Sequence, residues 1–89
     1  MKLNFPNDSR SYDPEKNRVR FWGYDGALEI SFFVDSAALK KLNPEMGDVE
    51  AAVLTVFDAA RKRIYEVADK VYWRDRNDSY AYSLAAADF

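Results

Sequence analysis

Two runs of alternating residues around Asp25 and Gly26 constrain the fold of this chain more than any other feature. Aspartate followed by glycine tolerates positive φ, and between two such runs it is typical of a two-residue β-hairpin turn. Residues 18–24 and 27–34 are therefore predicted to form two antiparallel strands.

Alternation within these runs sorts their side chains between two faces of the predicted sheet. Pairing about the turn places Tyr24 opposite Ala27, and Arg18 opposite Phe33 within reach of a cation–π contact. One face is wholly apolar: Val19, Phe21, Leu28, Ile30 and Phe32. The other is mixed: Arg20, Trp22, Tyr24, Glu29, Ser31 and Phe33. A one-residue slip would exchange the two sets, so the pattern favours this register.

Two helices are predicted after the hairpin. Asp35 or Ser36 caps a short helix over residues 37–42, and Asp48 caps a long helix of about 22 residues. The long helix carries one apolar stripe: Val49, Val53, Val56, Phe57, Ala60, Ile64, Val67, Ala68 and Val71. Its end is left open between Val71 and Arg74, because this segment also suits the start of a strand.

Short strands are predicted near both ends of the chain, around residues 3–5 and over residues 79–84. A polar loop follows the first, and Phe89 anchors a tail after the last. The predicted class is α+β in one domain spanning residues 1–89, with the order β-β-β-α-α-β. An antiparallel sheet of three to four strands has one short and one long helix packed on one face. The other face is left uncovered.

Several segments carry a resemblance to a known family: Asn4–Pro6, Val19–Gly23, Leu28–Val34 with Ala38 and Leu39, and Ala86–Phe89. In this order and chain length, they resemble a small bacterial family, domain-of-unknown-function family 1488. The resemblance implies a compact two-layer α+β fold similar to that of KH domains. No activity is established for the family, so the resemblance assigns no functional residue.

KH domains clamp nucleic-acid phosphates with a Gly-X-X-Gly loop between two helices. The same Gly-X-X-Gly pattern occurs here as Gly23-Tyr24-Asp25-Gly26, but it lies inside the predicted hairpin and contains an acidic residue. The predicted helix–helix junction, residues 43–48, is acidic and holds one glycine. A hairpin accounts for both glycines better than a phosphate clamp does.

Composition excludes several function classes. The chain has no cysteine and no histidine, so disulfides, Cys/His zinc sites and catalysis built on either residue are excluded. The formal net charge of −2 gives no general surplus of positive charge for nucleic acid. No apolar run reaches the ~20 residues of a membrane helix, and no signal-peptide core is found, so a cytoplasmic location is expected. We expect no cofactor and no metal.

The mixed sheet face is the first candidate interface: Arg20, Trp22, Tyr24 and Phe33. Such rings are typical of protein interfaces and also of platforms that stack unpaired bases. A purely structural alternative is that the N-terminal segment covers them through Phe5 or Tyr12. A second candidate interface lies outside the stripe of the long helix, where Leu54, Arg61 and Tyr65 share one direction with Asp58.

Acidic residues are numerous, but each lies where aspartate is favoured for local reasons, in a turn, on a helix surface or in the tail. No nucleophile is accompanied by a recognisable base. The sequence therefore predicts a non-enzymatic protein interaction module, acting on a foreign partner or as a homodimer. The alternative is a KH-like module that binds single-stranded RNA or DNA.

Overall fold

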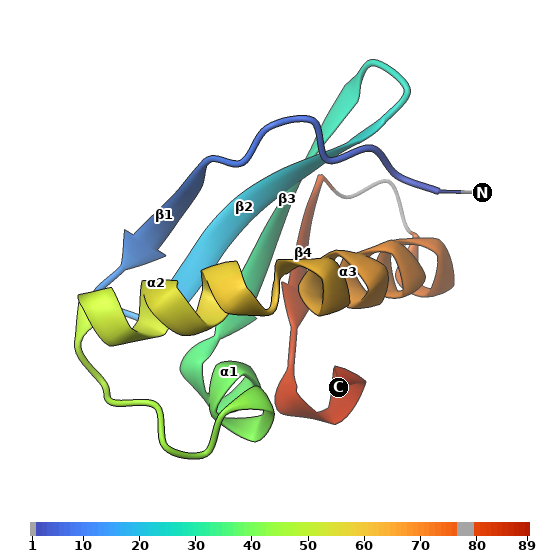
Figure 1. Cartoon of the computed structure of the whole chain (residues 1–89). Coiled ribbons are helices and arrows are strands. Elements are labelled where there is room, and N and C mark those ends of the chain that lie inside the picture. The colour runs from blue at the N-terminus through green and yellow to red at the C-terminus, as the bar shows by residue number, and fades with distance from the viewer. Residues whose placement is uncertain (1, 77–79) are drawn as a thin grey trace.

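The computed structural model describes residues 2–76 and 80–89. Its strands are β1 (Arg10–Asp13), β2 (Arg18–Asp25), β3 (Leu28–Asp35) and β4 (Ala81–Leu84). Its helices are α1 (Ser36–Leu42), α2 (Glu50–Ala59), α3 (Arg61–Asp75) and the short 3₁₀ helix η1 (Ala86–Asp88). In Figure 1, the helices all lie on one side of a four-stranded sheet ordered β1-β2-β3-β4. The predicted two-layer α+β class is confirmed.

The β2–β3 hairpin forms as predicted, but its register differs by two residues. Asp25 pairs with Leu28, so Gly26 and Ala27 make the turn, and Gly26 alone takes a positive φ of 63°. The hydroxyl of Tyr72 on α3 donates to the Asp25 carboxylate at 2.7 Å, which holds Asp25 at the strand end. A shift of two residues leaves every side chain on its predicted face, because the side-chain period of a strand is two.

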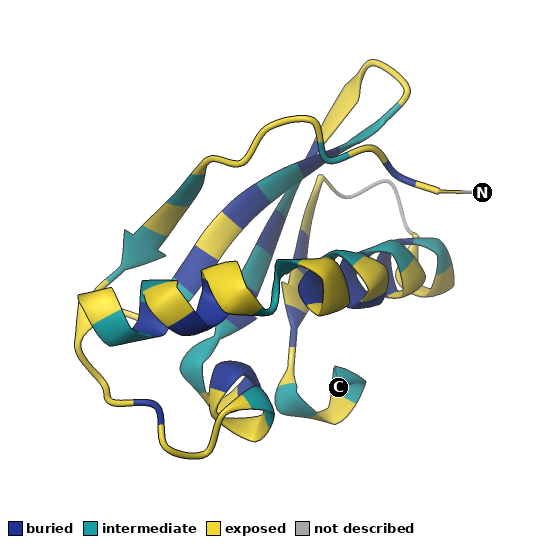
Figure 2. Cartoon of the chain, viewed as in Figure 1, coloured by how far each residue is buried: buried dark blue, intermediate teal, exposed yellow. Residues whose placement is uncertain are grey.

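That alternation builds the core. Along β2, buried and more exposed residues alternate, as Figure 2 shows. Phe21 stacks on Phe32 of β3, with ring centroids 5.4 Å apart, and meets Phe57 of α2 at the same distance. Leu28 was predicted on the buried face but is 41% exposed, because it lies at the hairpin end, before the segment of β3 that β4 covers.

The long predicted helix is two helices. Ala60 leaves α-helical geometry (φ −105°, ψ 13°) between α2 and α3, and its N–H is shared between the carbonyls of Val56 and Phe57. No glycine or proline lies nearby, and the side chains on either side of the break, Asp58 and Arg61, both bind the segment around β1. Within the predicted stripe, Val49 is exposed and Ala60 is only partly buried, while the other seven residues are buried.

The structure also corrects the start of the predicted helix and settles its end, which the sequence left open. Asp48 does not cap it; Val49 takes that position without a side-chain bond, and Asp48 pairs with Lys40 at 3.2 Å. At the other end, α3 continues to Asp75, because Val71 and Tyr72 are buried on its inner side. The short helix α1 is capped as predicted, by the Asp35 carboxylate that accepts from the N–H of Ala38 at 2.9 Å.

The outer strands differ most from prediction. Residues 3–5 contribute one bridge, Asn4 to Tyr24, whereas β1 lies within the predicted loop. β1 escaped detection because it is a polar edge strand, as edge strands commonly are. β4 pairs parallel to β3, not antiparallel, since the helices return the chain to the same end of the sheet before it enters.

The predicted tail anchor is confirmed, since Phe89 packs against the core. Ser79 of the predicted last strand and residues 77–78 of the predicted loop lie outside the described residues. No helix in the described part of the chain is long and apolar enough to span a membrane.

Phe21→Ala and Ile64→Ala should each lower the free energy of unfolding by about 2–5 kcal/mol, because each leaves a cavity between the sheet and the helices. Both side chains are almost fully buried. Urea denaturation measures the loss, with Val49→Ala, at a site 68% exposed, as the control. Wild-type stability in both core variants would contradict the helix-on-sheet core.

Gly23→Ala should destabilise the protein by about 1–3 kcal/mol through overpacking. A Cβ at Gly23 would lie 2.6 Å from Cε1 of Phe5, so the Phe5 ring would have to shift and disturb its stack on Tyr65. Gly47→Ala is the matched control, since its Cβ would meet nothing closer than 3.8 Å. Thermal unfolding compares the two, and equal melting temperatures would contradict the close approach.

Candidate protein interface

The first candidate interface lies on the sheet face that points away from the helices; we call it the outer face. Arg20, Trp22 and Tyr24 come from β2, and Phe33 comes from the neighbouring strand β3. Arg20 is exposed, while the three rings are partly buried. The structure thus brings together all four residues singled out from the sequence.

Arginine–aromatic contacts organise this face. The Arg20 guanidinium lies 5.1 Å from the Trp22 ring centroid and 5.7 Å from that of Phe33, and it donates to Ser31 Oγ at 2.9 Å. The predicted contact of Arg18 with Phe33 is present at 3.8 Å, reached diagonally because Arg18 pairs directly with Asp35. Exposed cation–π contacts of this kind contribute about 0.5–1 kcal/mol each to stability. Each contact is therefore weak, and its main effect here is to orient the ring.

Arg18 is not among the predicted interface residues, although its alternation with Arg20 places it on the same face. Beside it lies a hollow of about 210 Å³, lined in part by Lys16 and Phe33. Arg18 also pairs with Asp13 at 3.2 Å. Burial raises the pKa of Asp13, but hydrogen bonds from two backbone N–H groups and from Arg18 outweigh it and lower that pKa.

Acidic charge borders the other end of the outer face. The Tyr24 hydroxyl donates to the Glu29 carboxylate at 2.9 Å, and this bond raises the pKa of Tyr24. Glu29 is exposed on the hairpin. The outer face therefore carries arginine, aromatic and carboxylate groups side by side.

The N-terminal segment does not cover this face through the two residues considered for that role. Phe5 lies on the core side, where its ring stacks on Tyr65 of α3 with centroids 4.2 Å apart. Tyr12 also packs against the core. The rings of the outer face stay without a cover in the described part of the chain.

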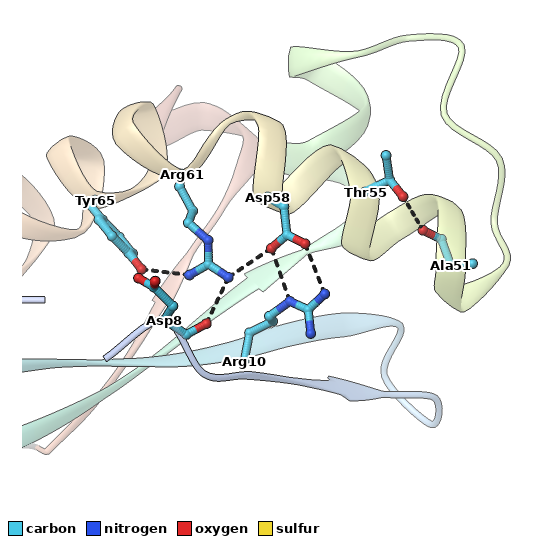
Figure 3. A network of polar contacts seen from close by, with 7 residues as sticks. All are labelled: Asp8, Arg10, Ala51, Thr55, Asp58, Arg61 and Tyr65. Carbon is cyan, nitrogen blue, oxygen red and sulfur yellow. Dashed lines mark hydrogen bonds and ion pairs between the residues drawn. The ribbon is translucent and has the colours of Figure 1, made fainter. Parts of the chain in front are cut away.

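The second candidate interface is occupied by contacts within the chain. Figure 3 shows Arg61 donating to the Tyr65 hydroxyl, to the backbone carbonyl of Asp8 and to the Asp58 carboxylate. Arg10 of β1 reaches the same carboxylate with two hydrogen bonds, at 2.9 and 3.0 Å. Leu54 packs against the core. This set ties β1 and the segment before it to the junction of α2 and α3.

Asp58→Asn should remove about 1 kcal/mol of stability at neutral pH, a low figure because the side chains of Asp58 and Arg10 are 41% and 33% exposed. The hydrogen bond from Arg10 lowers the pKa of Asp58 below its ordinary value of about 3.8. This contribution is present above that ordinary value and is lost as pH falls through the lowered pKa. Urea titrations from neutral to acid pH should show the two proteins converging, and a constant difference would contradict it.

The Gly-X-X-Gly pattern lies within the β2–β3 hairpin: Gly23 is in β2 and Gly26 is in the turn. Among the described residues, no group of three or more His, Cys, Asp or Glu is placed to hold a metal ion.

The family model for proteins of unknown function named DUF1488 matches residues 3–84. This chain belongs to the DUF1488 family. The match includes every segment that suggested the resemblance except the closing Ala86–Phe89.

A crystal structure of a DUF1488 protein of unknown function from Shewanella loihica PV-4 is similar, with a TM-score of 0.80 and 17% identity. The similarity covers 93% of this chain and 91% of that one, and at this identity it shows the shared fold. No curated protein matches the chain.

Proposed function

We propose that this DUF1488 protein is a non-enzymatic interaction module that self-associates through the outer face. The observation that supports this most directly is the Arg20 guanidinium over two rings, Trp22 and Phe33, on a face without a helical cover. Tryptophan, tyrosine and arginine are the side chains in which interfaces concentrate binding energy. We keep the expectation of a cytoplasmic protein.

A second copy suits the charges of this face. Arg20 and Glu29 are both exposed there, on neighbouring strands. A two-fold axis that lies in the plane between two stacked copies, and passes midway between these residues, would bring Arg20 of one copy to Glu29 of the other, and would do so twice. Glu29 disfavours the alternative, because a nucleic-acid phosphate placed on these rings would lie near its carboxylate.

The size of the face argues for a weak dimer. Two of its four strands, β1 and β4, are only four residues long, so the face is small. Stable interfaces bury about 800 Å² on each partner. Association should therefore depend on concentration, and monomers should predominate in dilute solution.

Trp22→Ser should abolish self-association while leaving the helical circular dichroism unchanged, because Trp22 packs on the outer face and not under the helices. Sedimentation velocity from about 10 µM to about 1 mM should show wild-type mass rising and the variant staying monomeric. Val49→Ser, at an exposed apolar site on the helical side, is the control and should dimerise normally.

A wild-type protein that stays monomeric throughout this range would contradict self-association. Single-stranded oligonucleotides provide the second arm of the experiment. Salt-sensitive binding by the monomer, lost in Trp22→Ser, would establish the nucleic-acid alternative in its place.

A further inference from the structure

A groove of about 410 Å³ runs between the N-terminal segment and α3, on the helical side of the sheet. Its apolar lining comes from Leu3, Phe5 and Tyr65. The volume falls within the range of small-molecule sites, about 300–1,000 Å³. This groove shares no residue with the outer face, so its ligand chemistry is independent of the proposed function.

The wall formed by the N-terminal segment is held in place from both sides. The Leu3 N–H donates to Asp69 Oδ1 at 2.7 Å, and Asn4 exchanges two backbone hydrogen bonds with Tyr24 at 2.8 and 2.9 Å. Phe5 is fixed by its stack on Tyr65. The groove is therefore a preformed feature of the fold, with little ordering cost for a ligand.

Three lysines and two carboxylates line the groove, which leaves an excess of one positive charge. Lys2, Lys62 and Lys70 line it, and their ammonium groups have no ion-pair or hydrogen-bond partner within the described residues. Of the two carboxylates that also line it, Asp69 already accepts from the Leu3 N–H and from Trp73 Nε1. Glu66 is the second, and like the lysines it has no ion-pair or hydrogen-bond partner within the described residues.

We propose that this groove binds a small free carboxylate with an apolar body. The body would lie against the Leu3, Phe5 and Tyr65 side chains, and the carboxylate would pair with the rim lysines. An apolar wall next to unpaired ammonium groups selects for a ligand that carries both characters, since a neutral ligand gains less from the lysines than a carboxylate does and a cationic ligand is repelled by them.

The probe is 1-naphthylacetate, followed by amide chemical shifts of the isotope-labelled protein. Shifts should move at Leu3, Phe5 and Tyr65, with a dissociation constant of about 1 mM or below. 1-Naphthylacetamide has the same body without the charge, and it should bind about tenfold more weakly. Equal binding of the amide, or shifts that avoid the groove, would overturn the proposal.

Substitutions on the rim test the same point from the protein side. Lys62→Gln with Lys70→Gln should weaken 1-naphthylacetate binding about tenfold, and Glu66→Gln should tighten it about twofold. Lys16→Gln with Lys40→Gln changes the net charge equally away from the groove, and should leave binding unchanged.

An equal loss in both double variants would overturn the proposal, because it would reduce the effect to net charge. Thermal unfolding checks that each variant is folded. Trp22→Ser should still bind the probe, which separates this site from the outer face.

Discussion

Phe21 and Phe32 face each other across the β2–β3 pair, and the packing of the helices depends on them. Their stacked rings meet Phe57 of α2, Tyr82 of β4 and Phe5 of the N-terminal segment. Because alternate side chains of a strand point to opposite faces, committing these rings to the core commits Arg20 and Trp22 to the other side. The alternation of side chains along β2 and β3 therefore produces both the core and the outer face.

The sequence predicted the features that this local alternation determines. The hairpin, its two faces, the cap at Asp35 and the outer-face residues could be recognised because each depends on neighbours within a few positions. The predicted β2–β3 register was wrong by two residues, but the assignment of side chains to the two faces was unaffected. Asp25 stays in β2, where its carboxylate accepts a hydrogen bond from Tyr72, a residue far along the chain.

The features that escaped prediction depend on distant partners. The break at Ala60 is bordered by Asp58 and Arg61, which hold Arg10 and the carbonyl of Asp8. The strand β1 has no apolar alternation of its own and is defined by pairing with β2. Likewise, the groove requires Lys2 and Lys70 to lie together, which no spacing in the sequence indicates.

The parallel pairing of β4 has a consequence for how the chain folds. Residues that pair there, such as Ser31 and Ala81, are separated by more than half of the chain. The β2–β3 hairpin has a two-residue turn, and β-hairpins form in about 1–10 µs. For β4 to pair with β3, a much longer loop must first close, and closing it costs conformational entropy. We therefore expect β4 to join the sheet late. Until it does, the backbone N–H and C=O groups along one edge of β3 are unpaired and can pair with a strand of another chain.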